Sequence, residues 1–289
     1  MKNSSGINIR EPAVAGSFYP SDKRELEAFI ESALTDACTK AVPQGRVRAL
    51  ISPHAGYIYS GYTAAKGFAC LKDKDYENVI VIAPSHRVPF YGMALPDYTH
   101  FRTPAGDIKV NTEAVADIVS SASDTAFLRN DAHEDEHALE VQLPFVQKLL
   151  PEAELIPVVC GHISDFKKAA GILKKYWNEN TLWVISSDFT HYGRSFRYTP
   201  FTDDIEHSIE KLDMQAIDRI LDMNPEGFSD FIEKTGATVC GAVPILVLLN
   251  TVYEFREKLK TLLVDYTNSG RMLSDFSHSV SYASILFFS

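Results

Sequence analysis

Three short apolar runs, each followed closely by a histidine, constrain the fold of this chain most strongly. Runs of this length that are rich in Val, Ile and Leu are typical of buried strands in a parallel sheet. The run 47–51 leads to His54, 79–83 leads to His86, and 182–186 leads to His191. Because ligands of open α/β sheets gather outside the carboxyl ends of the strands, the pattern predicts a metal or acid–base site at one edge of a sheet.

Helical patterns alternate with these strands and predict the fold class. A helix over 21–40, with Ser21 as its N-cap, precedes the first strand, and a helix over 62–71 separates the first two strands, which favours parallel pairing. Further helices are expected at 112–121, 137–150, 165–177, 204–223, 225–234 and 241–255, and further strands at 155–159, 261–267 and 280–288. Residues 87–110 are expected to form short strands or a long loop.

We therefore expect residues 1–289 to form a single α/β domain, in which a central mixed, largely parallel sheet is flanked by helices. Residues 1–10 are expected to be a loose N-terminal segment. Pro157 interrupts the hydrogen-bonding capacity of its strand, which places that strand at an edge or a bulge of the sheet.

Composition narrows the class of protein. A net charge of -10 argues against a nucleic-acid partner and against an anionic membrane surface. The sequence shows neither a signal peptide nor an apolar run of about 18 residues, so we expect a cytoplasmic protein with no membrane span. It contains no GxGxxG, Walker A or GxSxG motif, so no nucleotide cofactor and no α/β-hydrolase chemistry are expected.

The four cysteines are far apart and form no CxxC pair, which favours a reducing compartment. We expect Cys38, Cys70 and Cys160 to be small buried hydrophobic residues. Cys240 precedes an apolar helix, whose dipole would lower the pKa of the thiol and make it a metal ligand or a nucleophile. The alternative for Cys240 is the same buried, inert role.

Two pairs of polar residues could carry the chemistry. His54 and His86 could bind one metal ion, since neutral imidazole is the commonest protein ligand for iron, copper and zinc, or they could make ordinary loop hydrogen bonds. Asp188 lies three residues before His191 and could orient it as a general acid or base. Alternatively, Asp188 caps a helix and His191 is exposed.

Other polar and aromatic residues are candidates for lining a pocket. Residues 133–137 read His-Glu-Asp-Glu-His and match the HExxH metalloprotease motif, but they lie in an acidic segment at the start of a helix, which disfavours that function. His137, with Glu140, is instead expected to line the site or to cap the helix. Ser85 and Ser187 are also expected to line the site. Tyr57, with Tyr59 and Tyr62, could line a pocket for a small aromatic or peptide ligand, or pack around a glycine turn.

Five motifs together resemble the Memo family, which in prokaryotes is called AmmeMemoRadiSam system protein B. They are Glu-Pro-Ala-Val-Ala-Gly-Ser-Phe-Tyr-Pro at 11–20, Ser-Pro-His-Ala-Gly-Tyr at 52–57, Pro-Ser-His at 84–86, Asp-Glu-His-Ala-Leu-Glu at 135–140 and Ser-Ser-Asp-Phe-Thr-His-Tyr-Gly at 186–193. That family is similar in fold to the class III, LigB-type extradiol dioxygenases, which use non-haem iron. The resemblance implies a pocket at the strand ends, with His54, His86 and Cys240 as metal ligands and Asp188 and His191 beside them.

The resemblance also implies a cofactor and partners. Family members are associated with iron or copper, the vertebrate relatives with phosphopeptide signalling, and the prokaryotic genes with AMMECR-type and radical-SAM genes. The dioxygenases use a carboxylate where this chain offers Cys240, and a thiolate favours softer ions, so dioxygenase activity does not follow from the fold alone.

Three functions are therefore open. The first is a metal-dependent redox protein, and the second is a module that binds a small molecule, a peptide or a partner protein in the same pocket. The third is a cysteine-dependent hydrolase or transferase, with Cys240 as the nucleophile and His191 as the base.

Overall fold

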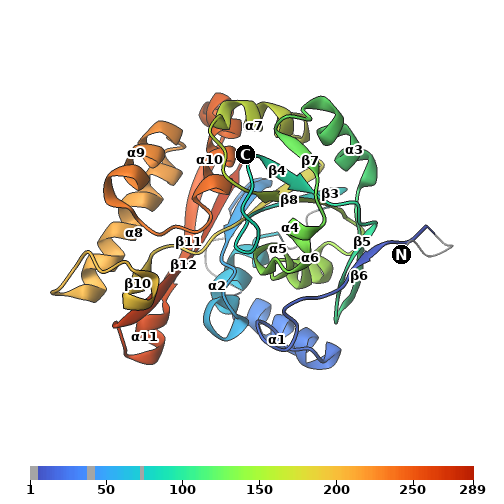
Figure 1. Ribbon diagram of the computed structural model, residues 1–289. Helices are drawn as coiled ribbons and strands as arrows, with labels where there is room; N and C mark the ends of the chain where they lie inside the picture. Colours follow the sequence, from blue (N-terminus) through green and yellow to red (C-terminus); the bar gives the residue numbers. More distant parts are fainter. Residues whose placement is uncertain (1–5, 38–42, 72–74) are drawn as a thin grey trace.

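A large mixed β-sheet runs through the centre of the molecule (Figure 1). The computed structural model describes residues 6–37, 43–71 and 75–289. In this part of the chain the strand order is β10-β12-β2-β9-β3-β8-β4-β7, β11 also pairs with β12, and β1, β5 and β6 form a separate small sheet. The strands are β1 (Ile9–Arg10), β2 (Val47–Ser52), β3 (Asn78–Pro84), β4 (Met93–Leu95), β5 (His100–Thr103), β6 (Gly106–Lys109), β7 (Ala126–Leu128), β8 (Glu154–Cys160), β9 (Thr181–Ser186), β10 (His191–Gly193), β11 (Lys260–Asn268) and β12 (His278–Phe288).

The four strands at the centre of the sheet are parallel. β2 pairs with β9, β9 with β3 and β3 with β8, all in the same direction, whereas β12 and β4 run antiparallel to their central neighbours β2 and β8. Nearly every residue of the central strands is buried, as expected for strands covered on both faces. The predicted α/β fold with a mixed, largely parallel sheet is confirmed.

Helices cover both faces of the sheet (Figure 1). α1, α2 and α6 pack together on one face, and α3, α7 and α10 on the other. The helices are α1 (Lys23–Asp36), α2 (Tyr57–Ala69), α3 (Thr112–Ser121), α4 (Asp131–Glu134), α5 (His137–Glu140), α6 (Leu143–Leu149), α7 (Phe166–Leu173), α8 (Ile205–Leu221), α9 (Pro225–Thr235), α10 (Ala242–Val252) and α11 (Ser269–Leu273), with 3-10 turns η1 (Lys174–Tyr176), η2 (Arg194–Phe196) and η3 (Tyr253–Lys258). In the described ranges, none of these helices is long and apolar enough to span a membrane.

Three predicted helices differ from the observed ones. α1 is capped by Asp22 rather than Ser21, since the Asp22 carboxylate accepts the N–H groups of Arg24 and Glu25. The predicted continuation of this helix to residue 40, including Cys38, lies outside the described residues. α2 begins at Tyr57, five residues earlier than predicted, and the helix expected over 137–150 is divided into α5 and α6.

The expected edge position of the strand that contains Pro157 is wrong. β8 lies between β3 and β4. However, β4 pairs only with Val159 and Cys160, so Pro157 lies beyond the residues that β4 reaches. The missing N–H of the proline is therefore tolerated inside the sheet because one neighbour is short.

The expected loose segment over residues 1–10 is wrong for its last residues. Ile9 and Arg10 form β1, which pairs with β5, and residues 1–5 lie outside the described part. The buried Arg10 guanidinium forms an ion pair with Glu140, and both side chains are at most 1% exposed. Glu140 also accepts hydrogen bonds from Ala13 N (2.8 Å), Val14 N (3.1 Å) and the Tyr19 hydroxyl. One buried carboxylate thus anchors the N-terminal motif.

Candidate functional site

The carboxyl ends of three neighbouring strands bring the histidines together. β9 lies between β2 and β3, so the two strands expected to be neighbours are separated by the third. Because all three run in the same direction, His54 after β2, His86 after β3 and His191 after β9 reach the same edge of the sheet. They line one cavity of about 370 Å³, together with Asp188 and His137.

The hydrogen bonds of Ser186 fix which nitrogen of His54 faces the site. The Ser186 hydroxyl donates to Ala138 O at 2.6 Å, and it accepts from the Gln142 amide at 3.1 Å. Since its only proton is already donated, Ser186 must accept from His54 Nδ1, which lies 2.8 Å away. His54 therefore carries its proton on Nδ1 and presents the lone pair of Nε2. Burial lowers the pKa of His54 well below its ordinary value, so the ring is neutral.

A buried carboxylate orients His86 in the same way. Glu136 Oε2 accepts the backbone N–H of His86 at 2.6 Å, and Glu136 Oε1 lies 2.9 Å from His86 Nδ1. Although burial opposes it, the hydrogen bond from His86 lowers the pKa of Glu136, so the carboxylate is ionised and can only accept. His86 Nδ1 is consequently the donor, and Nε2 offers its lone pair. A carboxylate behind a histidine is the usual arrangement around metal-ligating histidines.

His191 is oriented by main-chain carbonyls. Its Nδ1 lies 2.9 Å from Phe189 O and 3.1 Å from Thr238 O, which can only accept, so Nε2 is the basic nitrogen. The carboxylate of Asp188 instead accepts the N–H of His54 at 2.8 Å, and burial raises its pKa. Asp188 is therefore not the acceptor of the His191 Nδ1 proton, although the two side chains interact electrostatically. The alternative that Asp188 caps a helix is wrong, because β10 follows.

Cys240 lies beside His54, on the loop before α10. Its sulfur is 3.0 Å from His54 Nε2 and accepts the N–H of Asp188 at 3.1 Å. Burial, followed by the charge of Asp188, raises the pKa of the Cys240 thiol well above its ordinary value. The expected lowering by the helix dipole is thus outweighed, and the protonated thiol donates to the lone pair of His54.

The donor atoms form two groups that share His54. Within each group, one donor atom per residue lies within 4.8 Å of the others: His54, His86 and His137 make the first group, and His54, Asp188 and Cys240 the second. The set implied by the family resemblance, His54, His86 and Cys240, is therefore divided between them. Burial lowers the pKa of His137 to about 4, so this imidazole is also neutral near pH 7.

Three residues expected to line the pocket, Tyr57, Ser187 and Ser85, do not line the strand-end cavity. Tyr57 is buried in the core, where its hydroxyl donates to Val141 O at 2.8 Å and its ring stacks on Phe29. Tyr59 lines the cavity in its place. Ser187 is fully buried and accepts the N–H of Gly241 at 3.1 Å, so it supports the loop of Cys240.

Ser85 opens onto a neighbouring cavity that Cys240 also lines, and its hydroxyl donates to Val88 O at 2.7 Å. His133 turns away from the site: it is buried, and its Nε2 lies 3.0 Å from Ala94 O. The two histidines of the HExxH match thus belong to separate short helices, α4 and α5, and do not form a metalloprotease site.

The two residues that orient the histidines, Ser186 and Glu136, were not predicted as functional. Ser186 is the last residue of β9, and the alternation of a buried strand gives it no distinguishing signal. Glu136 was visible in the acidic segment before α5, but its distance of fifty residues from His86 hid the contact.

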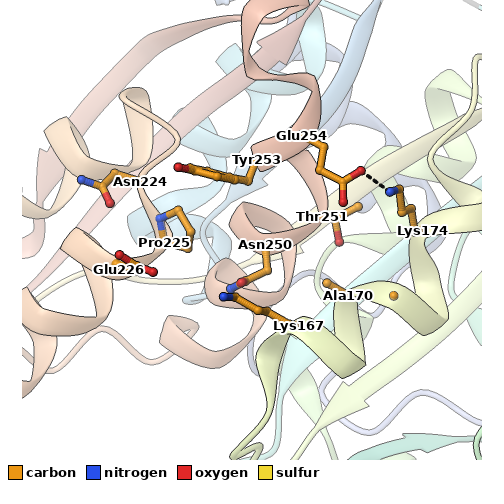
Figure 2. Close-up of a pocket in the computed structure, with 11 residues that line it drawn as sticks. Lys167, Ala170, Lys174, Asn224, Pro225, Glu226, Asn250, Thr251, Tyr253 and Glu254 are labelled. Carbon is orange, nitrogen blue, oxygen red and sulfur yellow. Dashed lines mark hydrogen bonds and ion pairs between the residues drawn. The ribbon is translucent and has the colours of Figure 1, made fainter.

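A further cavity, of about 330 Å³, lies between α7, α9 and α10 (Figure 2). Lys167, Lys174, Glu226 and Glu254 line it, and Lys174 forms an ion pair with Glu254. The described residues that line it include neither histidine nor cysteine, so its chemistry differs from that of the strand-end cavity.

Comparison with known proteins identifies the family. A family model described as Memo-like protein matches residues 10–286. The chain belongs to the Memo family. Protein MEMO1 of Danio rerio is 34% identical, and Protein MEMO1 of Homo sapiens is 32% identical, each over 97% of both chains. Protein memo-1 homolog of Caenorhabditis elegans is 33% identical over 99% of this chain and 84% of its own length.

Membership of the Memo family covers nearly the whole chain, from β1 to β12. Both the anchored N-terminal motif and the strand-end cavity therefore lie inside the part of the chain that matches the family.

Proposed function

We propose that this Memo-family chain is a metal-dependent redox protein that binds iron or copper in the strand-end cavity. One observation carries the proposal: hydrogen-bond acceptors hold the Nδ1 protons of His54 and His86, so that both Nε2 lone pairs are offered in the same cavity. Cys240 adds a sulfur 3.0 Å from His54 Nε2. Neutral imidazoles and a thiol suit iron, copper or zinc better than magnesium or calcium.

The donor atoms fit such an ion without a rearrangement of the sheet. His54 and His86 follow rigid central strands, and Ser186 and Glu136 orient their rings from behind. Binding would replace the thiol proton of Cys240, since a coordinating thiol is deprotonated despite its raised pKa. Iron or copper would supply one-electron transfer and an open coordination position for a substrate.

His191 supplies the proton chemistry beside the metal ligands, and Asp188 has a positioning role. Two carbonyls hold the Nδ1 proton of His191, so its Nε2 can accept one proton from a bound molecule and return it. Asp188 positions the main chain of His54 through the hydrogen bond from its N–H. A shared pathway with AMMECR-type and radical-SAM proteins is part of the proposal and rests on the family resemblance alone.

A second candidate function rests on the contact between Cys240 and His54. A thiol 3.0 Å from a neutral imidazole is the geometry of a cysteine nucleophile and its base, although the base here is His54 rather than the expected His191. Rapid alkylation of Cys240 by iodoacetamide near pH 7 in the metal-free protein would support it. The raised pKa of the thiol predicts slow alkylation, which favours the metal-dependent function.

Metal stoichiometry tests the proposal. The protein is purified without oxygen, reconstituted with Fe(II) or Cu(I), and its metal content is measured by mass spectrometry. We expect about one ion per chain in the wild type, and loss of that ion in His54→Ala and in Cys240→Ser. His162→Ala is the matched control, because His162 is exposed and packs on Tyr91 outside the strand-end cavity. Metal-free wild type, or full retention in both site variants, would overturn the proposal.

A further inference from the structure

The neighbouring cavity onto which Ser85 opens lies at the same edge of the sheet, one strand further along. Its volume is about 470 Å³, and its described lining comes from the ends of β3 and β8, the loops after them and the start of α10. We call it the β3–β8 cavity. The two strands are parallel neighbours, and Pro84 pairs with Cys160 at their carboxyl ends. Ligands of open α/β sheets bind at this edge, and the volume suits a small molecule.

Main-chain hydrogen bonds hold two walls of the β3–β8 cavity together. The N–H of Gly161 donates to Gly92 O at 2.9 Å, and the N–H of His162 donates to Phe90 O at 2.8 Å. The two loops approach so closely that a Cβ on Gly161 would lie 2.2 Å from Phe90 O. The fold itself therefore forms the cavity before any molecule binds.

The lining of the β3–β8 cavity is largely apolar and uncharged. Among the described residues that line it, none is Asp, Glu, Lys or Arg, and the apolar part comes from Pro84, Val88, Pro89, Phe90, Tyr91 and Val243. Burial raises the pKa of the Cys160 thiol to about 12 and that of Cys240 well above its ordinary value, so both thiols are neutral near pH 7. A charged ligand would lose its hydration without gaining a counter-charge, which favours an uncharged one.

The hydroxyl of Ser85 is a polar group that can orient a ligand in this cavity. It donates its only proton to Val88 O at 2.7 Å, so its oxygen can only accept a further hydrogen bond. The N–H of Ser85 donates to Cys160 O at 2.9 Å, which fixes the main chain at this position. A matching ligand therefore offers one O–H or N–H donor on an otherwise apolar body.

We infer that the β3–β8 cavity is a binding site for an uncharged, largely apolar small molecule that donates one hydrogen bond to Ser85. Cys240 joins this site to the strand-end cavity, because its sulfur lies 3.0 Å from His54 Nε2 while the residue lines the β3–β8 cavity. A molecule bound here would lie beside that sulfur. The inference goes beyond the proposed function, since it assigns a second site and requires no metal ion.

Three probes of similar size test the inference on the metal-free full chain, with binding measured by ligand-observed nuclear magnetic resonance. Benzyl alcohol is uncharged and has one donor, benzyl methyl ether lacks the donor, and benzoate is charged. We expect benzyl alcohol to bind to the wild type, the ether to bind about 3- to 10-fold more weakly, and benzoate at least about tenfold more weakly. In Ser85→Ala the alcohol should lose its advantage over the ether, because the acceptor is removed.

Val243→Trp places the probe, because Val243 lines the cavity and its replacement by tryptophan fills the space. Val119→Trp is the matched control, since Val119 is also half-buried but lies on α3, away from the lining. Benzyl alcohol binding should be lost in Val243→Trp and retained in Val119→Trp, and circular dichroism confirms that each variant is folded. If Val243→Trp does not fold, the comparison of alcohol and ether in Ser85→Ala decides the question.

Absence of benzyl alcohol binding to the wild type, equal binding of benzoate, or full binding in folded Val243→Trp would overturn the inference. These outcomes leave the proposed function intact, because metal content is measured separately. A chain that binds benzyl alcohol as expected but takes up no metal would overturn the proposed function alone.

Discussion

Replacing Glu140 by alanine should destabilise the protein strongly. The change leaves the guanidinium of Arg10 buried, at 1% exposure, without its counter-charge. Breaking a buried ion pair from one side costs about 3–5 kcal/mol. The N–H groups of Ala13 and Val14 also lose their acceptor. We therefore expect a loss of about 4 kcal/mol or more in the free energy of unfolding.

Urea unfolding followed by circular dichroism measures this loss. With a slope of about 3 kcal/mol/M for a chain of this size, the midpoint should fall by roughly 1.3 M. The double variant Arg10→Met, Glu140→Gln removes both charges and keeps an acceptor for the backbone, so it should recover most of the loss. A midpoint for Glu140→Ala within about 0.3 M of the wild type would refute the reasoning, because it would mean that Arg10 needs no buried partner.

Three further predictions follow from particular contacts. Glu136→Gln should weaken metal binding by about 10- to 100-fold, because the carboxylate that orients His86 is lost. Competition with a chelator measures the metal affinity, and an unchanged affinity would contradict the orienting role of Glu136. Burial lowers the pKa of His133 to about 4, so the unfolded state binds the extra proton first as the pH falls. Protonation of His133 therefore leaves the free energy of unfolding unchanged above about pH 6.5 and lowers it by about 3 kcal/mol in total toward pH 4. Urea unfolding of the wild type and of His133→Gln at pH 7 and 4.5 measures this loss, which should be larger in the wild type. An equal loss in both proteins would refute the prediction. Gly241→Ala would place a Cβ 2.3 Å from Ser187 Cβ, so the loop of Cys240 must shift. We expect the free energy of unfolding to fall by about 1–3 kcal/mol, measured by thermal unfolding. An unchanged melting temperature would contradict the close approach.

The sequence predicted the elements that carry the site because they are governed by strong local patterns. Buried strands followed by histidines identify β2, β3 and β9, and parallel pairing brings their ends together. That inference needs only apolar run length and the direction of the strands. The inference did not depend on the order of the strands. That order differs from the expected one, because β9 lies between β2 and β3.

The residues that complete the site depend on contacts between distant segments. Arg10 meets Glu140 across 130 residues, and Glu136 meets His86 across fifty. Such pairs carry no periodic signal. Tyr57 was misplaced for a different reason: α2 begins at this residue, so its side chain turns into the core. The pKa of Cys240 was misjudged because burial outweighs the helix dipole.

Anomalous X-ray scattering from crystals reconstituted with iron or copper tests the central claim most directly. Data collected on either side of the metal absorption edge locate the ion without reference to any activity. We predict one strong peak in the strand-end cavity, about 2.0–2.3 Å from the Nε2 atoms of His54 and His86. A fully loaded protein with its peak elsewhere, or crystals that show no peak in this cavity, would contradict the account.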